Sequence, residues 1–331
     1  MEDPVLGLLI GGFILLWIGG ELVVRGSVGL AKSMGVSPLL IGLVVVAFGT
    51  SSPELFIALS AVAEGNDTIA VGNVVGSNIA NILLVLGFGA LLYPIPARGP
   101  VVFRDGSVML GATGFFIYLA YRGTIDQQVG MVLLGLLAAY LIFAYLQERM
   151  TFQPDEQEEV KRNRNLMNLM ARNGTLRSAL FTIAGITALI FGARFLVDGA
   201  IEFATRWEVS ESVIAISMVA IGTSIPELAM VIVASLRRHS QLVIGGILGS
   251  NIFNLLVVMG IPALFWPIDV SPEFLTRDIW VMAGAALILM PFMLTGGRVG
   301  RLGGLTLLAL YAAYIYVLYA GLPPQLAGLL A

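Results

Sequence analysis

Long apolar segments alternate with short polar breaks along the chain, and this alternation sets the fold that the sequence predicts. Each segment has about 20 residues or more, the length that a helix needs to cross the roughly 30 Å hydrocarbon core of a bilayer. We therefore predict an all-α membrane protein with ten transmembrane helices. Their expected ranges are 5–30, 36–63, 68–93, 103–121, 127–146, 176–203, 209–236, 241–266, 277–294 and 302–322.

The second half of the chain repeats the first at a constant offset. Residues 20–109 match residues 193–282 without a gap, so that Glu54 corresponds to Glu227, 173 positions later. Because each unit holds five helices, an odd number, the second unit must cross the membrane in the opposite sense, as in the inverted repeats of transporters. We predict a first five-helix repeat at 1–147, a polar linker at 148–174, and a second, inverted repeat at 175–331.

Basic residues indicate how the helices are oriented. With the N-terminus outside, most Lys and Arg side chains fall at the inner ends of the helices, as the positive-inside rule requires. The loop after the second helix carries Glu64 and Asp67, whereas its counterpart after the seventh carries Arg237, Arg238 and a solvated His239. We therefore expect a multi-pass protein of the cell membrane, with its N-terminus outside and the linker in the cytoplasm.

Composition narrows the possible functions. The chain has 331 residues, of which 58% are hydrophobic and 12% charged, and its net charge is −3. This balance offers no basic stripe for nucleic acid. With no cysteine and one histidine, the chain lacks the ligands for a disulfide frame, an iron–sulfur cluster or a zinc cluster. We expect the lipid bilayer as its surroundings, no cofactor and no obligatory protein partner.

One polar motif stands inside the apolar pattern of the second helix and returns in the seventh. It reads GTSSPEL from Gly49 and GTSIPEL from Gly222. A carboxylate at membrane depth is costly and marks a functional site by default. Pro53 has no N–H to offer the carbonyl of Gly49 and therefore predicts a kink that frees this oxygen.

The motif places hard oxygen donors together. Thr50 and Ser51 precede Glu54 by four and three residues, so that two hydroxyls and one carboxylate share a helical face. Such a donor set suits Na⁺ or Ca²⁺ and gives nothing to soft metals. The second copy supplies the corresponding residues Thr223, Ser224 and Glu227.

A second repeated motif follows one helix later, as GSNIAN from Gly76 and GSNIFN from Gly249. Ser77 and Asn81 are four residues apart, and we expect the antiparallel second and third helices to bring them to Glu54. Ser250, Asn254 and Glu227 would meet in the same way. Nearby glycines would let the helices approach closely. These are Gly72, Gly76, Gly245, Gly246 and Gly249.

Simpler roles exist for each of these residues. Hydroxyl and amide side chains often bond between membrane helices, and a single buried glutamate can be protonated. Two glutamates in duplicated contexts favour a binding site. Other charged neighbours are expected to be structural, as ion pairs or as caps and anchors at helix starts. They are Glu21 with Arg25, Arg194 with Asp198, Arg104 with Asp105, and Arg277 with Asp278. The tyrosines of the last helix are expected to face lipid or the interface. These are Tyr311, Tyr314, Tyr316 and Tyr319.

Together, the paired motifs resemble the two alpha-repeats of the sodium/calcium exchanger family, and the ten-helix layout is similar to that of prokaryotic calcium/sodium antiporters. The resemblance implies that the second, third, seventh and eighth helices enclose the ion sites, with the first and sixth as a sliding gate. It implies two alanines as ligands through their carbonyls. The implied set is Ala47, Thr50, Ser51, Glu54, Ser77, Asn81, Ala220, Thr223, Ser224, Glu227, Ser250 and Asn254.

One position departs from part of the family, since Asn254 stands where potassium-dependent members have Asp. The expected function is therefore K⁺-independent, electrogenic exchange of Na⁺ for Ca²⁺ by alternating access. A cation/proton exchanger using the same glutamates and a cation channel are the alternatives. An intramembrane enzyme is the weakest alternative, because the sequence offers no Ser/His, zinc or paired-Asp arrangement.

Overall fold

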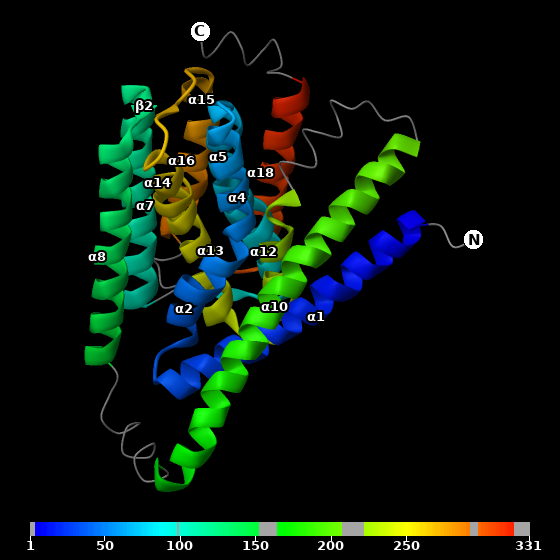
Figure 1. The fold of residues 1–331 in the computed structure, drawn as a ribbon, viewed down its shortest axis with the longest axis vertical. Coiled ribbons are helices and arrows are strands. Elements are labelled where there is room, and N and C mark those ends of the chain that lie inside the picture. Colours follow the sequence, from blue (N-terminus) through cyan, green and yellow to red (C-terminus); the bar gives the residue numbers. More distant parts are fainter. Residues whose placement is uncertain (1–3, 98, 152–163, 207–221, 292–296, 321–331) are drawn as a thin grey trace.

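The computed structural model describes residues 4–97, 99–151, 164–206, 222–291 and 297–320, and it is mostly helical (Figure 1). Six of the described helices are long and apolar enough to cross a membrane, and the bent pair Pro38–Thr50 and Ser52–Ala63 adds a seventh if it is one span. The chain is therefore a multi-pass helical membrane protein, as predicted. The number ten stays a prediction, since residues 207–221 and 292–296 lie outside the described part.

Helices of the first half follow the five expected segments. The second segment is divided, because a 42° bend separates its two parts at Ser51. The observed helices are α1 (Pro4–Met34), α2 (Pro38–Ile41), α3 (Ala47–Thr50), α4 (Ser52–Ala63), α5 (Asp67–Ala80), α6 (Gly87–Leu92), α7 (Pro100–Arg122) and α8 (Gln127–Thr151).

The expected linker at 148–174 is helical at both of its ends. Helix α8 of the first half continues to Thr151, and the first helix of the second half already begins at Arg164. Only the later part of the expected 209–236 helix is described. The observed helices are α10 (Arg164–Arg206), α12 (Ile225–Leu236), α13 (Ser240–Phe253), α14 (Gly260–Ala263), α15 (Glu273–Thr276), α16 (Asp278–Ile288) and α18 (Arg301–Ala320).

Three π-helical turns interrupt the α-helices, and the apolar pattern did not predict them. They are η1 (Gly42–Val46), η2 (Asn81–Leu86) and η3 (Asn254–Val258). A π turn adds a residue to one helical turn and changes which side chains face the neighbouring helices, and such turns are frequent at functional sites. Two of them begin at the asparagines of the repeated motif.

The duplication in the sequence is also visible in the elements. Helices α4 and α12 begin and end 173 positions apart, and so do α5 and α13. Four two-residue strands, absent from the all-α prediction, join the two halves. Strand β1 (Ile95–Pro96) pairs antiparallel with β4 (Arg298–Val299), and β2 (Thr124–Ile125) pairs antiparallel with β3 (Ile268–Asp269). Each strand of the first half thus bonds to one of the second.

Backbone contacts join α1 to α10, and the two helices lie alongside one another at an angle to the rest (Figure 1). A Cβ added to Gly12 would lie 2.9 Å from the carbonyl oxygen of Gly192, and one added to Gly19 would lie 2.9 Å from that of Gly185. Only glycine permits this distance. Since Gly12 and Gly185, and Gly19 and Gly192, are each 173 positions apart, the two contacts are related by the repeat.

Helix α13 packs at equally short range against the first part of the broken helix. A Cβ on Gly245 would collide with the backbone of Leu39, and one on Gly249 would meet Leu43 and Ala47. The predicted role of these two glycines is confirmed. A Cβ on Gly76 would meet nothing within 4 Å, so the close-packing role predicted for that glycine is wrong.

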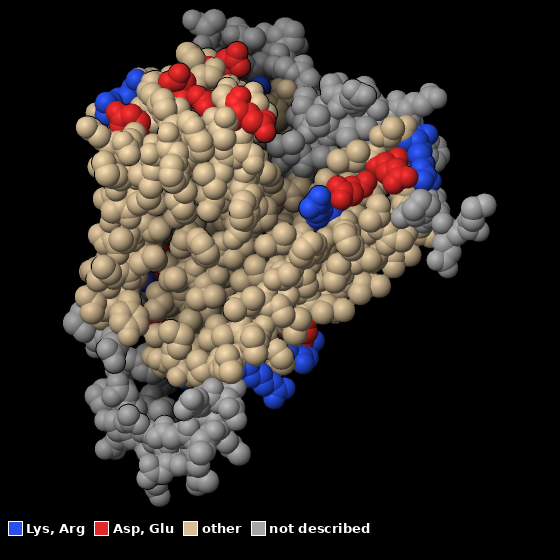
Figure 2. Space-filling view, in the orientation of Figure 1, with Lys and Arg blue, Asp and Glu red and all other residues tan. Residues whose placement is uncertain are grey.

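Charged side chains gather at the two ends of the bundle. Figure 2 shows Asp and Glu, with some Lys or Arg among them, at the end near α15, a group of both signs at the upper right beside α10, and mainly Lys and Arg at the lower end beside α1. The broad surface between them is almost free of charge in this view. Large apolar side chains are exposed on the described helices, including Phe13 and Trp17 on α1, as expected of a surface that contacts acyl chains.

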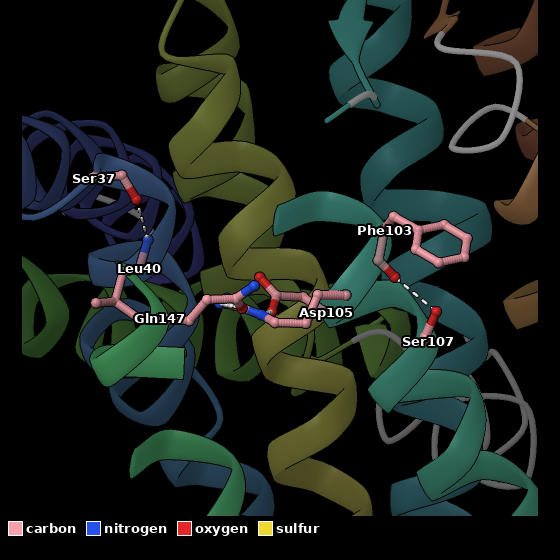
Figure 3. Close-up of polar contacts among 7 residues, drawn as sticks. Ser37, Leu40, Phe103, Asp105, Ser107 and Gln147 are labelled. Carbon is pink, nitrogen blue, oxygen red and sulfur yellow. Dashed lines mark hydrogen bonds and ion pairs between the residues drawn. The ribbon is translucent and has the colours of Figure 1, made fainter. Parts of the chain in front are cut away.

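A buried polar cluster ties α7 to α8 near the basic end (Figure 3). Arg104 donates to Asp105 at 2.5 Å and to Gln147 on α8 at 2.8 Å. The carboxylate of Glu148 accepts from the backbone N–H of Ser37 at 2.7 Å, just before α2. The prediction that Asp105 caps or anchors a helix start is wrong, because Asp105 lies in the second turn of α7 and is fully buried.

The remaining charged pairs agree with the predicted structural role. Glu21 bonds to Arg25 at 2.7 Å and also to Arg237 after α12, and Arg194 lies 3.9 Å from Asp198. The last helix differs from expectation in part. Tyr314 is half-buried and donates to Asp278 at 3.1 Å, and Tyr311 is 7% exposed, so these two tyrosines face protein. Tyr316 is exposed, as predicted.

Candidate functional site

Two broken helices carry the repeated glutamates at the same place. Glu54 is in the first turn of α4, directly after the bend at Ser51, and Glu227 is in the first turn of α12, directly after Ser224. In both copies proline occupies one of the first two helical positions, where its missing N–H costs nothing. The positive end of each helix therefore lies beside a carboxylate.

The two halves meet at these glutamates. Ser51 Oγ donates to Glu227 Oε1 at 3.3 Å, and the hydroxyls of Ser77 and Thr223 lie 3.3 Å apart. Each of these bonds joins a residue of the first motif set to one of the second. The repeated motifs thus form one site rather than two.

Burial around this site is nearly complete. Glu54 and Asn254 are 0% exposed, and no described member of the predicted ligand set exceeds 7%. Several of their polar atoms have no hydrogen-bond partner among the described residues, and buried polar groups normally have one. These atoms are both carboxylate oxygens of Glu54, Oε2 of Glu227, the hydroxyls of Ser224 and Ser250, and the side-chain amides of Asn81 and Asn254.

Thr50 and Ala47 belong to the same region but have partners in their own helix. Thr50 Oγ1 donates to the carbonyl of Val46 at 3.1 Å and lies 3.5 Å from that of Ala47. The Ala47 carbonyl also accepts from the N–H of Ser51 at 2.9 Å. Each carbonyl has a second lone pair that a cation can use. Ala220, the counterpart of Ala47, lies outside the described residues.

Asn73 was missed by the sequence analysis. Its Nδ2 donates to the backbone carbonyl of Glu54 at 3.1 Å, and the residue is 5% exposed. This bond fixes the first turn of α4 against α5. The motif comparison had no means of finding it, because the corresponding position in the second half is Gly246.

The donor chemistry fits a hard cation. Every unpartnered group in the site offers a carboxylate, hydroxyl or amide oxygen, the ligand types that Na⁺ and Ca²⁺ prefer. The described residues contain no group of three or more His, Cys, Asp or Glu side chains able to hold a metal ion. A cation held here would take two carboxylates and draw its other ligands from neutral oxygens.

The described ligand residues have almost no contact with water in this structure. A cavity of about 10 Å³ lies beside Ser51, roughly the volume that one water molecule needs. Phe48 and Phe253 line it, with ring centroids 5.7 Å apart. Two charged carboxylates in such a desolvated site are strongly unfavourable unless a cation or protons neutralise them.

The chain is similar in sequence to known membrane proteins. The family model for the sodium/calcium exchanger protein matches residues 4–146 and 177–320. The chain is 31% identical to the putative antiporter CaxA of Alkalimonas amylolytica, over 94% of this chain and 97% of that protein. It is also 31% identical to the sodium/calcium exchanger MaX1 of Methanosarcina acetivorans, with the same two shares.

A solved structure agrees over almost the full length. The sodium-calcium exchanger NCX_Mj, soaked with zero Na⁺ and Ca²⁺, superposes with a TM-score of 0.82 and 30% sequence identity. The match covers 95% of this chain and 99% of that one.

The fold and the site define a multi-pass membrane transporter of cations, and not an enzyme. The chain belongs to the sodium/calcium exchanger protein family. The family resemblance that the paired motifs indicated is thereby confirmed.

Proposed function

We propose that the protein is an electrogenic, K⁺-independent antiporter that exchanges Na⁺ for Ca²⁺ by alternating access. The observation that carries the proposal is the joining of the two repeated motifs around unpartnered, fully buried oxygens. The names of MaX1 and NCX_Mj, which cover nearly all of this chain, support the choice of ions.

Ten helices in two inverted five-helix repeats would build this transporter, with residues 1–147 and 175–331 as the repeats. The offset of 173 positions between α4 and α12 and the strand pairs that link the halves support this arrangement. The two segments matched by the family model also begin 173 positions apart. We place the N-terminus outside the cell membrane and the linker in the cytoplasm, from the distribution of basic residues.

Electrostatics would couple the two ions. One Ca²⁺ or two Na⁺ neutralise the carboxylates of Glu54 and Glu227, whereas an empty site would have to move two buried charges through the protein. The proposed ligands are therefore the set predicted from the sequence, with Ala47 and Ala220 acting through carbonyls. A third Na⁺, bound by carbonyl and hydroxyl oxygens, would make the exchange electrogenic.

The energy available matches calcium extrusion. Three Na⁺ moving down a tenfold gradient supply about 4.1 kcal/mol, and one net charge at 100 mV adds roughly 2.3 kcal/mol. Together they sustain a Ca²⁺ gradient of between about four and five decades. Because residue 254 is Asn and not Asp, Glu54 and Glu227 are the two acidic ligands of the proposed site. We propose that the lack of a third acidic ligand makes the exchange independent of K⁺.

Calcium flux in proteoliposomes tests the proposal. A Na⁺ gradient is expected to drive ⁴⁵Ca²⁺ uptake by the wild type, and Glu54→Gln and Glu227→Gln are each expected to abolish it. Glu64→Gln is the matched control, because it makes the same change on an exposed residue at the end of α4. Normal flux in both site variants would refute the site assignment.

Separate gradients distinguish the alternatives. Uptake driven by a pH gradient without Na⁺ would replace the proposal with a calcium/proton exchanger that protonates the same glutamates. Currents that need no counter-ion would identify a channel. K⁺ is applied alone in a third experiment, where we expect no uptake.

A further inference from the structure

A basic cavity lies outside the site described above, where three distant parts of the chain come together. It has a volume of about 620 Å³, within the range of ligand-binding pockets. Its walls are the residues after α6, the end of α12 and the start of α18. The pairing of β1 with β4 joins the first of these segments to the third.

Three arginines line this cavity, namely Arg238, Arg298 and Arg301, and none of its lining residues is acidic. All three are exposed, and none of them forms an ion pair with a described residue. The guanidinium of Arg238 lies 5.6 Å from the ring centroid of Tyr93, another lining residue, and is held over the ring. The cavity therefore concentrates positive charge without a counter-charge from the described chain.

Helix α18 adds to this charge. It begins at Arg301 in the wall of the cavity, runs for 20 residues, and has no acidic residue in its first turn. The first N–H groups of a helix have no partner within the helix, and its N-terminus carries a partial positive charge. An arginine at this end is unfavourable unless an anion lies nearby.

The two ends of the bundle differ in charge. At the other end of the bundle the corresponding cavity, of about 390 Å³, is lined by Asp67 and Asp269 instead. Of these two cavities between described residues, the one lined by arginines is therefore the one suited to an anion.

The surface beside the cavity indicates what kind of anion it is. Leu236, in the cavity wall, is 50% exposed, and Leu302 and Leu305 on α18 are 80% and 54% exposed. In a membrane protein such side chains contact acyl chains. We propose that the cavity binds the phosphate headgroup of an anionic phospholipid through Arg238, Arg298 and Arg301, with the acyl chains along α18.

Native mass spectrometry and thermal stability of the purified protein in detergent test this. Phosphatidylglycerol is expected to remain bound and to raise the melting temperature saturably, whereas phosphatidylcholine at equal concentration does neither. Each arginine near an anionic lipid contributes roughly 1 kcal/mol, so Arg298→Gln and Arg301→Gln should each weaken binding about fivefold. Native mass spectrometry measures the bound lipid itself, so a variant that is merely less stable can be distinguished from one that binds the lipid less tightly.

Arg177→Gln is the matched control, because Arg177 is also exposed and lies 5.1 Å from the ring centroid of Phe181. Its lipid affinity should equal that of the wild type. Equal retention of the two lipids, or unchanged affinity in the Arg298→Gln, Arg301→Gln double variant, would overturn the proposal. Glycerol 3-phosphate is tested separately, and full stabilisation by this soluble phosphate would overturn the assignment to a lipid.

Discussion

Substituting Gly192 by alanine should separate α1 and α10, the two helices that the family resemblance implies as a sliding gate. The added Cβ would lie 2.9 Å from the backbone nitrogen of Leu16 on α1 and 3.0 Å from the carbonyl oxygen of Gly12. Non-bonded contacts of this kind are comfortable near 3.5 Å, so α1 and α10 would have to move apart by roughly 0.5 Å. Both contacts are with backbone, which has no rotamer to change.

The size of the effect follows from this overpacking. Extra methyl groups in well-packed interiors cost typically about 1–3 kcal/mol, and a gap of about 0.5 Å forfeits roughly a quarter of the dispersion energy along the interface. Gly185→Ala should behave alike, since its Cβ would lie 2.6 Å from the backbone nitrogen of Val23. In the double variant, the loss of stability should equal or exceed the sum of the losses in the two single variants.

Thermal unfolding in detergent and ⁴⁵Ca²⁺ flux in liposomes measure the two consequences. We expect both glycine variants to melt several degrees lower and to transport more slowly. The control is Gly7→Ala on α1, where the Cβ would meet nothing within 4 Å and the substitution should be neutral or slightly stabilising. If Gly192→Ala and Gly185→Ala were as stable and active as Gly7→Ala, the close packing of α1 on α10 would be wrong.

Three further predictions concern single side chains. Ser51→Ala removes the 3.3 Å bond to Glu227 and should raise the half-saturating Ca²⁺ concentration about tenfold, which a flux titration measures. Asn254→Asp adds a third acid and should change the dependence of flux on Na⁺, K⁺ and H⁺, and an unchanged dependence would make the position a bystander. Partial burial, and then the positive charges of Lys32 and Arg237, lower the pKa of His239 in the folded protein. In the unfolded chain the pKa is about 6.5, so the folded protein is at its most stable, as far as His239 is concerned, above this pH. This stability is lost as the pH falls through the lowered pKa of the folded state. His239→Gln should therefore reduce the loss of melting temperature between pH 7.5 and pH 5.

Local pattern was enough to locate most of the described helices and to propose the residue types of the site. A period of 3.6 residues and a length of about 20 apolar residues are properties of a segment alone, so α1, α5 and α13 could be located without a partner. The glutamates could be singled out because a carboxylate in such a segment needs a reason. The duplication, also visible in the sequence alone, then showed which residues of the two halves correspond to one another.

Contacts between segments had to come from the tertiary structure. No pattern states that Ser51 bonds to Glu227 rather than to Glu54, or that Ser77 meets Thr223, because each bond joins residues more than 140 positions apart. The bend falls at Ser51 and the π turns begin at Asn81 and Asn254, where packing decides between nearly equal helical geometries. Asn73 has no counterpart in the second half, so the repeat concealed it.

By itself, then, the sequence determined the membrane class, the duplication and the chemistry of the donors, since these depend on composition and on short-range periodicity. Only the tertiary structure decided which donors share a site, how closely α1 lies on α10, and that Arg238, Arg298 and Arg301 line one cavity. The physical reason is that side chains far apart in the chain interact only after helix packing has fixed their positions.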